Sequence, residues 1–377
     1  MPRWEINFDM RLRIEDPRVV QLVAKVEALA SVIRGIPIPP HVQYRLDRLN
    51  VLRAVRGTTG IEGTDLSEEE VAEILSAPPE EIILKNGTRN REEQEVRNAE
   101  ALMKHVAEML RRDPTVPLNG HIIRRFHEII TQDIEYEHNE PGRYRTYGVN
   151  AGSYLPPQTG EEVQSLMAKF IDWFNTGRPS EWSPVIRAII GHFYVISIHP
   201  FGDGNGRTSR AVESYLLFQA GVNARGFYSL ANYYYKNRSD YVNHLEYVRF
   251  NSDGDLTRFV IFALKGLAEE LEAVHGEVLE EVRVISFRDY ARETLGTEGK
   301  LGTPVGERLF HFILGLGRDP ISLKALRSGE HPLSYIYKDV TNKTLMRDVH
   351  FLQEHQLVKV DGDSLQMNLE IMEQFTA

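Results

Sequence analysis

Apolar residues recur at steps of three and four along most of the chain, which is the spacing of an amphipathic helix. The clearest cases are the stretches Pro184–Ser197, Asn205–Gln219 and Leu118–Ile134. Ser67 is followed three residues later by Glu70, which is the spacing of a helix-starting capping box. A solvated helix face explains the many charges between residues 80 and 112. The pattern predicts a mainly α protein.

Two stretches depart from this spacing. Residues 139–157 place tyrosines, Thr146 and Val149 around glycine turns and end at two prolines, so we expect a short β-hairpin there. Gly296–Gly306 has the composition of a linker, and the residues after it predict three helices and a hairpin around Asp361-Gly362-Asp363, the order found in a winged helix. The predicted parts are an N-terminal helical region (1–100), a helical core carrying the hairpin (101–275), a helix and linker (276–300) and a small α+β winged-helix domain (301–377).

The segment between the two strongest helices, His199 to Arg210, reads HPFGDGNGRTSR. Its three glycines allow the backbone to turn N–H groups inward, and the helix that follows adds unpaired N–H donors and a partial positive charge. Arg207 and Arg210 lie one turn apart at the start of that helix. The combination predicts a phosphate-binding loop.

Two further side chains in this loop bring chemistry. His199 is of the type best suited to accept a proton near neutral pH. Asp203 is a lone carboxylate beside the expected phosphates, and one carboxylate with substrate oxygens and water is a common way to hold Mg²⁺. A base, a metal carboxylate and a phosphate site predict transfer of a phosphorus-containing group to a hydroxyl.

The segment matches every specified position of HxFx(D/E)GNGRxxR, so the chain resembles the Fic (AMP-transferase) family. The resemblance implies a Fic-type helical bundle that transfers AMP from ATP to a hydroxyl of a target protein and of itself. It implies that His199 deprotonates the hydroxyl, that Asp203 binds Mg²⁺ and that Phe201 anchors the loop in the core. The implied phosphate ligands are Gly204, Asn205, Gly206 and Arg207 for the α- and β-phosphates, and Arg210 for the γ-phosphate.

The sequence TTGIEG, which begins at Thr58, is by itself a helix end with Gly63 as its C-cap. It also resembles the family's inhibitory motif, (S/T)xxxE(G/N), in the class with an N-terminal inhibitory helix. The resemblance implies that Glu62, held by Thr58, pairs with Arg210 and blocks correct placement of the γ-phosphate. Two positions depart from the family pattern, namely Thr58 where serine is common and Thr64 where asparagine often follows.

The resemblance also implies docking of the target on the hairpin, as a flap over the loop, and contacts to adenosine after the signature helix. The residues concerned are Tyr147, Val149 and Tyr154 in the flap, and Tyr233, Tyr234 and Asn237 near adenosine. A structural loop and core packing are alternative explanations for these two groups.

Composition narrows the function classes. The 377 residues carry a formal net charge of −10, which argues against broad binding to nucleic acid or anionic membranes. The absence of cysteine excludes disulfides, thiolate chemistry and Cys-based zinc sites. No stretch has the length and apolar character of a signal segment or a membrane span, so we expect a soluble cytoplasmic protein.

Two alternative functions stay open. A Fic loop can remove AMP from a modified protein or transfer other phosphate-containing groups, in which case Glu62 could position a water. The chain could instead be a DNA-binding regulator whose core senses nucleotide without turnover. Residues 300–377 hold nine Lys and Arg against ten Asp and Glu, so DNA and protein are both open as partners of the C-terminal domain, as is a homodimer.

Overall fold

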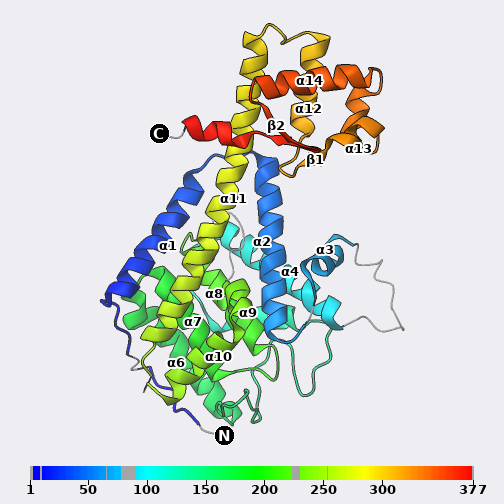
Figure 1. Ribbon diagram of the computed structural model, residues 1–377. Helices are drawn as coiled ribbons and strands as arrows, with labels where there is room; N and C mark the ends of the chain where they lie inside the picture. The colour runs from blue at the N-terminus through cyan, green and yellow to red at the C-terminus, as the bar shows by residue number, and fades with distance from the viewer. Residues whose placement is uncertain are drawn as a thin grey trace. The chain divides into compact units, whose positions relative to one another are not determined.

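The computed structural model describes residues 3–8, 11–64, 66–77, 91–222, 230–252 and 254–375, and the statements below concern these residues. They form two compact units, Met1–His275 and Gly276–Ala377. Both units consist mainly of helices, as the sequence predicts (Figure 1). The finer division into four parts stays a prediction.

The first unit contains eleven labelled α-helices and one short 3₁₀ helix. These are α1 (Pro17–Gly35), α2 (Pro40–Ile61), α3 (Glu68–Ser76), α4 (Arg91–Arg112), α5 (Gly120–Ile130), α6 (Gly160–Thr176), η1 (Arg178–Glu181), α7 (Pro184–Ile198), α8 (Asn205–Gln219), α9 (Leu230–Lys236), α10 (Arg238–Phe250) and the part of α11 (Thr257–Thr297) before residue 276. No β-strand occurs among the described residues of this unit.

Helix α7 forms the centre of this unit. Its sequence is apolar on nearly every face, and almost all of its side chains are buried. Helix α8 packs along α7, and α2, α4 and α5 pack against α8 (Figure 1). The loop between α7 and α8 therefore connects two helices that are held firmly together.

The end of α2 packs very closely against α9. A Cβ atom on Gly57 would lie 2.7 Å from the backbone carbonyl carbon of Ala231, and one on Gly60 would lie 2.5 Å from Cε2 of Tyr235. The two glycines thus allow this close approach, and α2 continues as far as Ile61. As a result, the TTGIEG stretch is helical up to Ile61 and packed against the rest of the unit.

The predicted hairpin at residues 139–157 is wrong. Instead of strands, the stretch has two isolated bridges, one between Ala151 and Tyr154 and one between Leu155 and Arg3. Side chains occupy the carbonyls that a strand ladder would need, because Arg145 donates to the carbonyl of Tyr147 and Gln158 donates to that of Val149. The stretch is therefore an irregular loop.

The second unit contains the rest of α11, α12 (Pro304–Gly315), β1 (Ile321–Ser322), α13 (Leu323–Ser328), η2 (Pro332–Tyr337), α14 (Asn342–Glu354), β2 (Val358–Asp361), β3 (Ser364–Met367) and η3 (Leu369–Phe375). The antiparallel sheet has the order β1-β3-β2, with Ile321 opposite Leu365 and Val358 opposite Met367. The unit has its own apolar core. Three helices and a hairpin are present as predicted, whereas the winged-helix assignment and a DNA or protein partner stay predictions.

Local sequence signals account for several helix boundaries. Both hydrogen bonds of the capping box between Ser67 and Glu70 are present at the start of α3. The predicted linker is shorter than expected, because α11 continues to Thr297 and α12 begins at Pro304.

In the described ranges, no helix is both long enough and apolar enough to cross a lipid bilayer.

Candidate active site

The loop between α7 and α8 is fixed at both ends and in the middle. His199 ends α7 with φ 52° and ψ 58°, a left-handed conformation that few non-glycine residues adopt, and Gly204 precedes α8 with φ 72°. The Asn205 side chain accepts a hydrogen bond from Phe201 N and donates one to Phe201 O, both at 2.9 Å. Phe201 is fully buried and stacks on His127 with ring centroids 3.7 Å apart, as expected for an anchor in the core.

The start of α8 offers a site for an anion. The N–H groups of Asn205, Gly206 and Arg207 precede the first hydrogen bond of the helix, which runs from Thr208 N to Gly204 O. The carboxylate of Glu62 lies over Gly206, so close that a Cβ atom there would collide with Glu62 Oε1. In this structure a carboxylate thus lies where the helix start would attract a phosphate.

Arg210 lies against the end of α2 and is almost completely buried. Its Nη2 donates to Glu62 Oε1 at 2.5 Å and to the Thr58 carbonyl at 2.9 Å, and its Nε donates to Thr58 Oγ1 at 2.9 Å. The Thr58 hydroxyl thus binds Arg210, whereas the resemblance implied that Thr58 holds Glu62. Partial burial acts to raise the pKa of Glu62, but the charge and hydrogen bond of Arg210 outweigh it and hold that pKa below its usual value.

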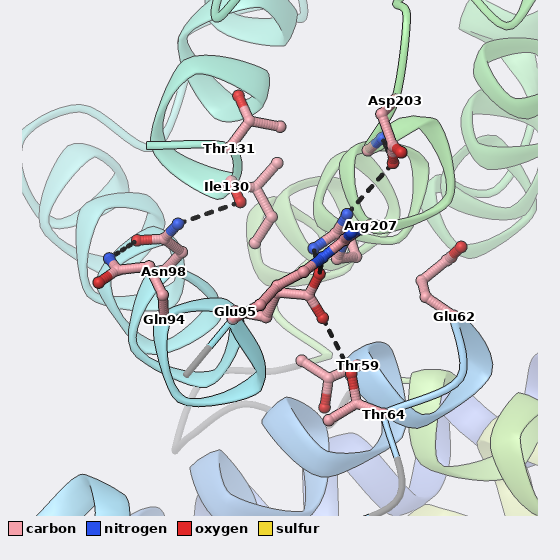
Figure 2. A network of polar contacts seen from close by, with 12 residues as sticks. Thr59, Glu62, Thr64, Gln94, Glu95, Asn98, Ile130, Thr131, Asp203 and Arg207 are labelled. Atoms are coloured by element: carbon pink, nitrogen blue, oxygen red, sulfur yellow. Dashed lines mark hydrogen bonds and ion pairs between the residues drawn. The ribbon is translucent and has the colours of Figure 1, made fainter. Parts of the chain in front are cut away.

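Arg207 is also buried and lies between two carboxylates (Figure 2). Its Nη1 is 3.2 Å from Glu95 Oε1, and its Nη2 is 3.3 Å from Asp203 Oδ1. The guanidinium also lies over the ring of Tyr136, 5.3 Å from the centroid. Its Nε and Nη1 are buried, and Nη1 faces the Glu95 carboxylate.

Glu95 is a site residue that the sequence reasoning missed. Its Oε2 accepts from Thr64 Oγ1 at 2.9 Å, and its Oε1 accepts from Tyr136 OH at 3.0 Å and Arg91 Nε at 3.1 Å. Burial acts to raise the pKa of Glu95, but Arg207 and these donors lower it overall.

The assignment of every charge in this region to a solvated face was therefore wrong for Glu95, which is buried. A signal was present in the sequence. Glu95 precedes Ala99, Leu102 and Val106 by four, seven and eleven residues, which places a carboxylate on the apolar stripe of α4.

His199 has the surroundings of a neutral imidazole. Burial lowers its pKa to about 4. Its Nδ1 lies 3.3 Å from the carbonyl of Ile196, which favours the tautomer with the proton on Nδ1 and leaves Nε2 as an acceptor. Arg145 donates through Nε to the His199 carbonyl at 2.8 Å and through its backbone N–H to the Pro200 carbonyl at 2.9 Å. The loop at 139–157 therefore supports the backbone of His199.

Asp203 could bind a metal ion whose other ligands come from a bound molecule and from water. Its side chain is 44% exposed, and Oδ1 accepts from Gly204 N at 2.5 Å. Across the ranges that the structure describes, no three His, Asp or Glu side chains group closely enough to hold a metal ion. A cation at Asp203 would therefore take its other ligands from phosphates and water, which is how Mg²⁺ is often bound.

The three flap candidates lie in different surroundings. Tyr154 is 1% exposed and packs over the guanidinium of Arg249, so it belongs to the core instead of a docking surface. Tyr147 is half-buried, and its hydroxyl donates to the carbonyl of His138. Val149 is half-buried, with its carbonyl bound by Gln158.

The adenosine candidates lie mostly in packed surroundings. Tyr234 is fully buried and donates to Glu213 at 2.9 Å, which places it in the core and not in a site open to a nucleotide. Tyr233 is 7% exposed and packs on Phe262, with ring centroids 5.2 Å apart. Asn237 donates to the Tyr233 carbonyl at 3.0 Å just before α10.

Part of this chain matches a known protein family. Residues 117–217 match the Fic/DOC family. The protein adenylyltransferase Fic of Drosophila willistoni is 27% identical over 263 residues, covering 67% of this chain and 47% of that protein. The protein of the same name from Aedes aegypti is 28% identical over 219 residues, covering 58% and 40%. This chain therefore spans less than half the length of these relatives.

Two solved structures share the fold. A Fic family protein from Desulfovibrio desulfuricans G20 is 21% identical with a TM-score of 0.55, covering 97% of this chain and 98% of that one. Fic-1 from C. elegans (residues 134–508) is 21% identical with a TM-score of 0.56, covering 70% and 72%. Together with the signature loop, the family match indicates a Fic/DOC domain over residues 117–217, and the two solved structures show that the chain shares the fold of Fic family proteins.

Proposed function

We propose that this protein is an AMP transferase that moves AMP from ATP to a hydroxyl of a target protein and of itself. The observation that carries the proposal is the carboxylate of Glu62 at the start of α8, beside the buried Arg210, where the loop that begins with His199 ends. A site that holds one anion next to a proton acceptor suits a nucleotide whose phosphorus is attacked by a hydroxyl. The names of the curated relatives support the same reaction.

Each residue of the loop has a role in this reaction. Nε2 of His199 takes the proton of the target hydroxyl while the oxygen of that hydroxyl bonds to the α-phosphorus. The bond between this phosphorus and the oxygen that bridges to the β-phosphate breaks, so pyrophosphate leaves. The start of α8, with Gly204, Asn205 and Gly206, and the side chain of Arg207 bind the α- and β-phosphates. Asp203 would hold Mg²⁺, which neutralises phosphate charge when it is bound.

The same contacts support regulation by Glu62. Arg210 is the cation for the γ-phosphate in this proposal, and its Nη2 is bound by Glu62. Because one guanidinium edge cannot hold both anions, ATP would bind with its γ-phosphate displaced and its α-phosphorus out of line for attack. The protein is then autoinhibited until Glu62 leaves Arg210.

One observation favours a second reaction, removal of AMP from a modified protein. The Glu62 carboxylate lies over Gly206, at the start of the helix into which the His199 loop leads. A water between the side chains of Glu62 and His199 could attack a phosphodiester in place of the incoming hydroxyl. Release of AMP from a labelled protein, dependent on Glu62, would identify this reaction.

Self-labelling with ATP radiolabelled at the α-phosphorus tests the main proposal. We expect weak labelling of the wild type with Mg²⁺, strong labelling of Glu62→Gly, and a loss of about 100-fold or more when His199→Ala is added. Label from ATP radiolabelled at the γ-phosphorus would show phosphoryl transfer instead. A silent Glu62→Gly protein that still binds ATP would contradict AMP transfer.

A further inference from the structure

The turn that carries Glu62 has a second attachment. Gly63 takes φ 108° and reverses the chain, so that Thr64 points back into the protein. Thr64 is only 7% exposed, and its hydroxyl donates to Glu95 Oε2 at 2.9 Å (Figure 2). Its N–H bonds to the carbonyl of Thr59 at 3.3 Å. The turn at residues 62–64 is therefore fastened on both sides of the glycine.

The partner of Thr64 is well fixed. Arg91, Tyr136 and Arg207 all lie within 3.2 Å of Glu95 Oε1, and the Glu95 side chain is 6% exposed. Because Arg207 belongs to α8, the chain of contacts Thr64–Glu95–Arg207 leads back to the helix that also carries Arg210. The turn is thus bound to α8 directly through Glu62 and indirectly through Thr64.

These two attachments differ in exposure. The Glu62 side chain is 36% exposed, so solvent reaches its contact with Arg210 from the carboxylate side. The bond from Thr64 to an ionised carboxylate is buried and charge-assisted, which makes it stronger than a hydrogen bond between neutral groups. The more exposed contact is the one that must break for a γ-phosphate to reach Arg210 in the proposed function.

We propose that the Thr64–Glu95 hydrogen bond is a latch that keeps the turn at residues 62–64 where Glu62 covers Arg210. Thr64 is then a positioning residue, acting through Glu62, and Glu95 is its fixed partner. The inference rests on the proposed function and deepens it, because it names what holds the inhibitory carboxylate in place. It also gives a role to Thr64, one of the two positions where this chain departs from the family pattern.

Three substitutions test the latch in the full chain. Thr64→Val removes the hydroxyl with little change of volume, and we expect self-labelling to rise about fivefold, as for the loss of one hydrogen bond. Thr64→Ser keeps a hydroxyl and should label like the wild type. Thr59→Val is the matched control, since its buried hydroxyl donates to carbonyls of its own helix, those of Val55 and Arg56.

A double variant separates the latch from a general effect on the site. In the Glu62→Gly background, Thr64→Val should add nothing, because the group that the latch positions is gone. An equal increase in that background would overturn the proposal. So would a Thr64→Val protein that folds and labels no better than Thr59→Val.

Hydrogen exchange provides a readout that needs no AMP transfer. The amides of residues 60–64 should exchange faster in Thr64→Val than in the wild type or Thr59→Val, without nucleotide. Unchanged exchange in Thr64→Val would overturn the latch. If Glu62→Gly transfers no AMP while exchange behaves as expected, the proposed function fails and the latch stands.

Discussion

Glu62 at the end of α2 and Glu95 at the start of α4 each bind one arginine of the same site, but their surroundings differ. Glu62 is 36% exposed, follows a helix whose last turns contain Gly57 and Gly60, and precedes a left-handed glycine. Glu95 is 6% exposed and lies among four donors in a continuous helix. The first carboxylate is placed so that it can leave, and the second is built in.

This difference explains how the start of α8 can hold two buried arginines when no nucleotide is bound. Each needs a counter-ion, because an unpaired buried charge is costly. Arg207 has a buried partner in Glu95. Arg210 has a partly exposed partner in Glu62, which in the proposed function an incoming phosphate replaces.

The largest expected effect is on the free energy of unfolding, and it tests whether Glu62 and Glu95 differ. Glu95→Gln leaves Arg207 buried without its main counter-ion and should lower the free energy of unfolding by about 3 kcal/mol. Glu62→Gln removes a carboxylate that is 36% exposed and leaves Arg210 bonded to the Thr58 hydroxyl and carbonyl, so it should lower the free energy of unfolding by less, about 1 kcal/mol. Urea denaturation of both full-length variants measures this, and equal losses would show that the two carboxylates are equivalent.

A smaller effect comes from the glycines of α2. A Cβ atom on Gly57 would meet backbone of α9, which cannot rotate away, so Gly57→Ala should shift the end of α2, cost about 2 kcal/mol and raise self-labelling. Gly60→Ala meets the ring of Tyr235, which can move, and should cost less. Gly276→Ala, with no atom within 4 Å of its added Cβ, is the matched control in a helix.

Labelling assays and urea denaturation of these three alanine variants would be compared. A Gly57→Ala protein as inhibited and as stable as Gly276→Ala would mean that close packing of α2 on α9 does not hold Glu62 in place.

The smallest expected effect concerns pH, because inhibition by Glu62 should not change with pH near neutrality. The pKa of Glu62 is held low, so the pair with Arg210 is complete above the usual carboxyl range and is lost only as pH falls through that lowered pKa. The pKa of His199 is about 4, so its imidazole is also neutral above the usual carboxyl range. The ratio of Glu62→Gly to wild-type labelling should stay constant between about pH 6 and 8. A ratio that changes severalfold would mean that one of these groups titrates near neutrality.

Sequence reasoning succeeded where function is local. The signature loop, the helices on both sides of it and the burial of Phe201 follow from residues that are adjacent in the chain. It failed where distant segments meet. Nothing near Glu95 in the sequence indicates that Thr64 and Arg207 supply its partners.

The wrong hairpin has a related cause. Tyrosines and Val149 around glycine turns are typical of strands, but the carbonyls in that stretch bond to side chains such as Arg145 and Gln158. Arg145 in turn is fixed by the backbone at His199 and Pro200. A propensity for strands was thus overridden by contacts that only the folded chain brings together.

The loop at His199–Arg210 also lies between helix ends of opposite polarity. His199 closes α7, where unpaired carbonyls give a partial negative charge, and Gly204 opens α8, where unpaired N–H groups give a partial positive charge. In the proposed reaction, a proton taken up at His199 would therefore lie near the negative end, while the phosphate charge would lie at the positive end. The backbone of two packed helices would thus favour the charge separation of that reaction before any side chain contributes.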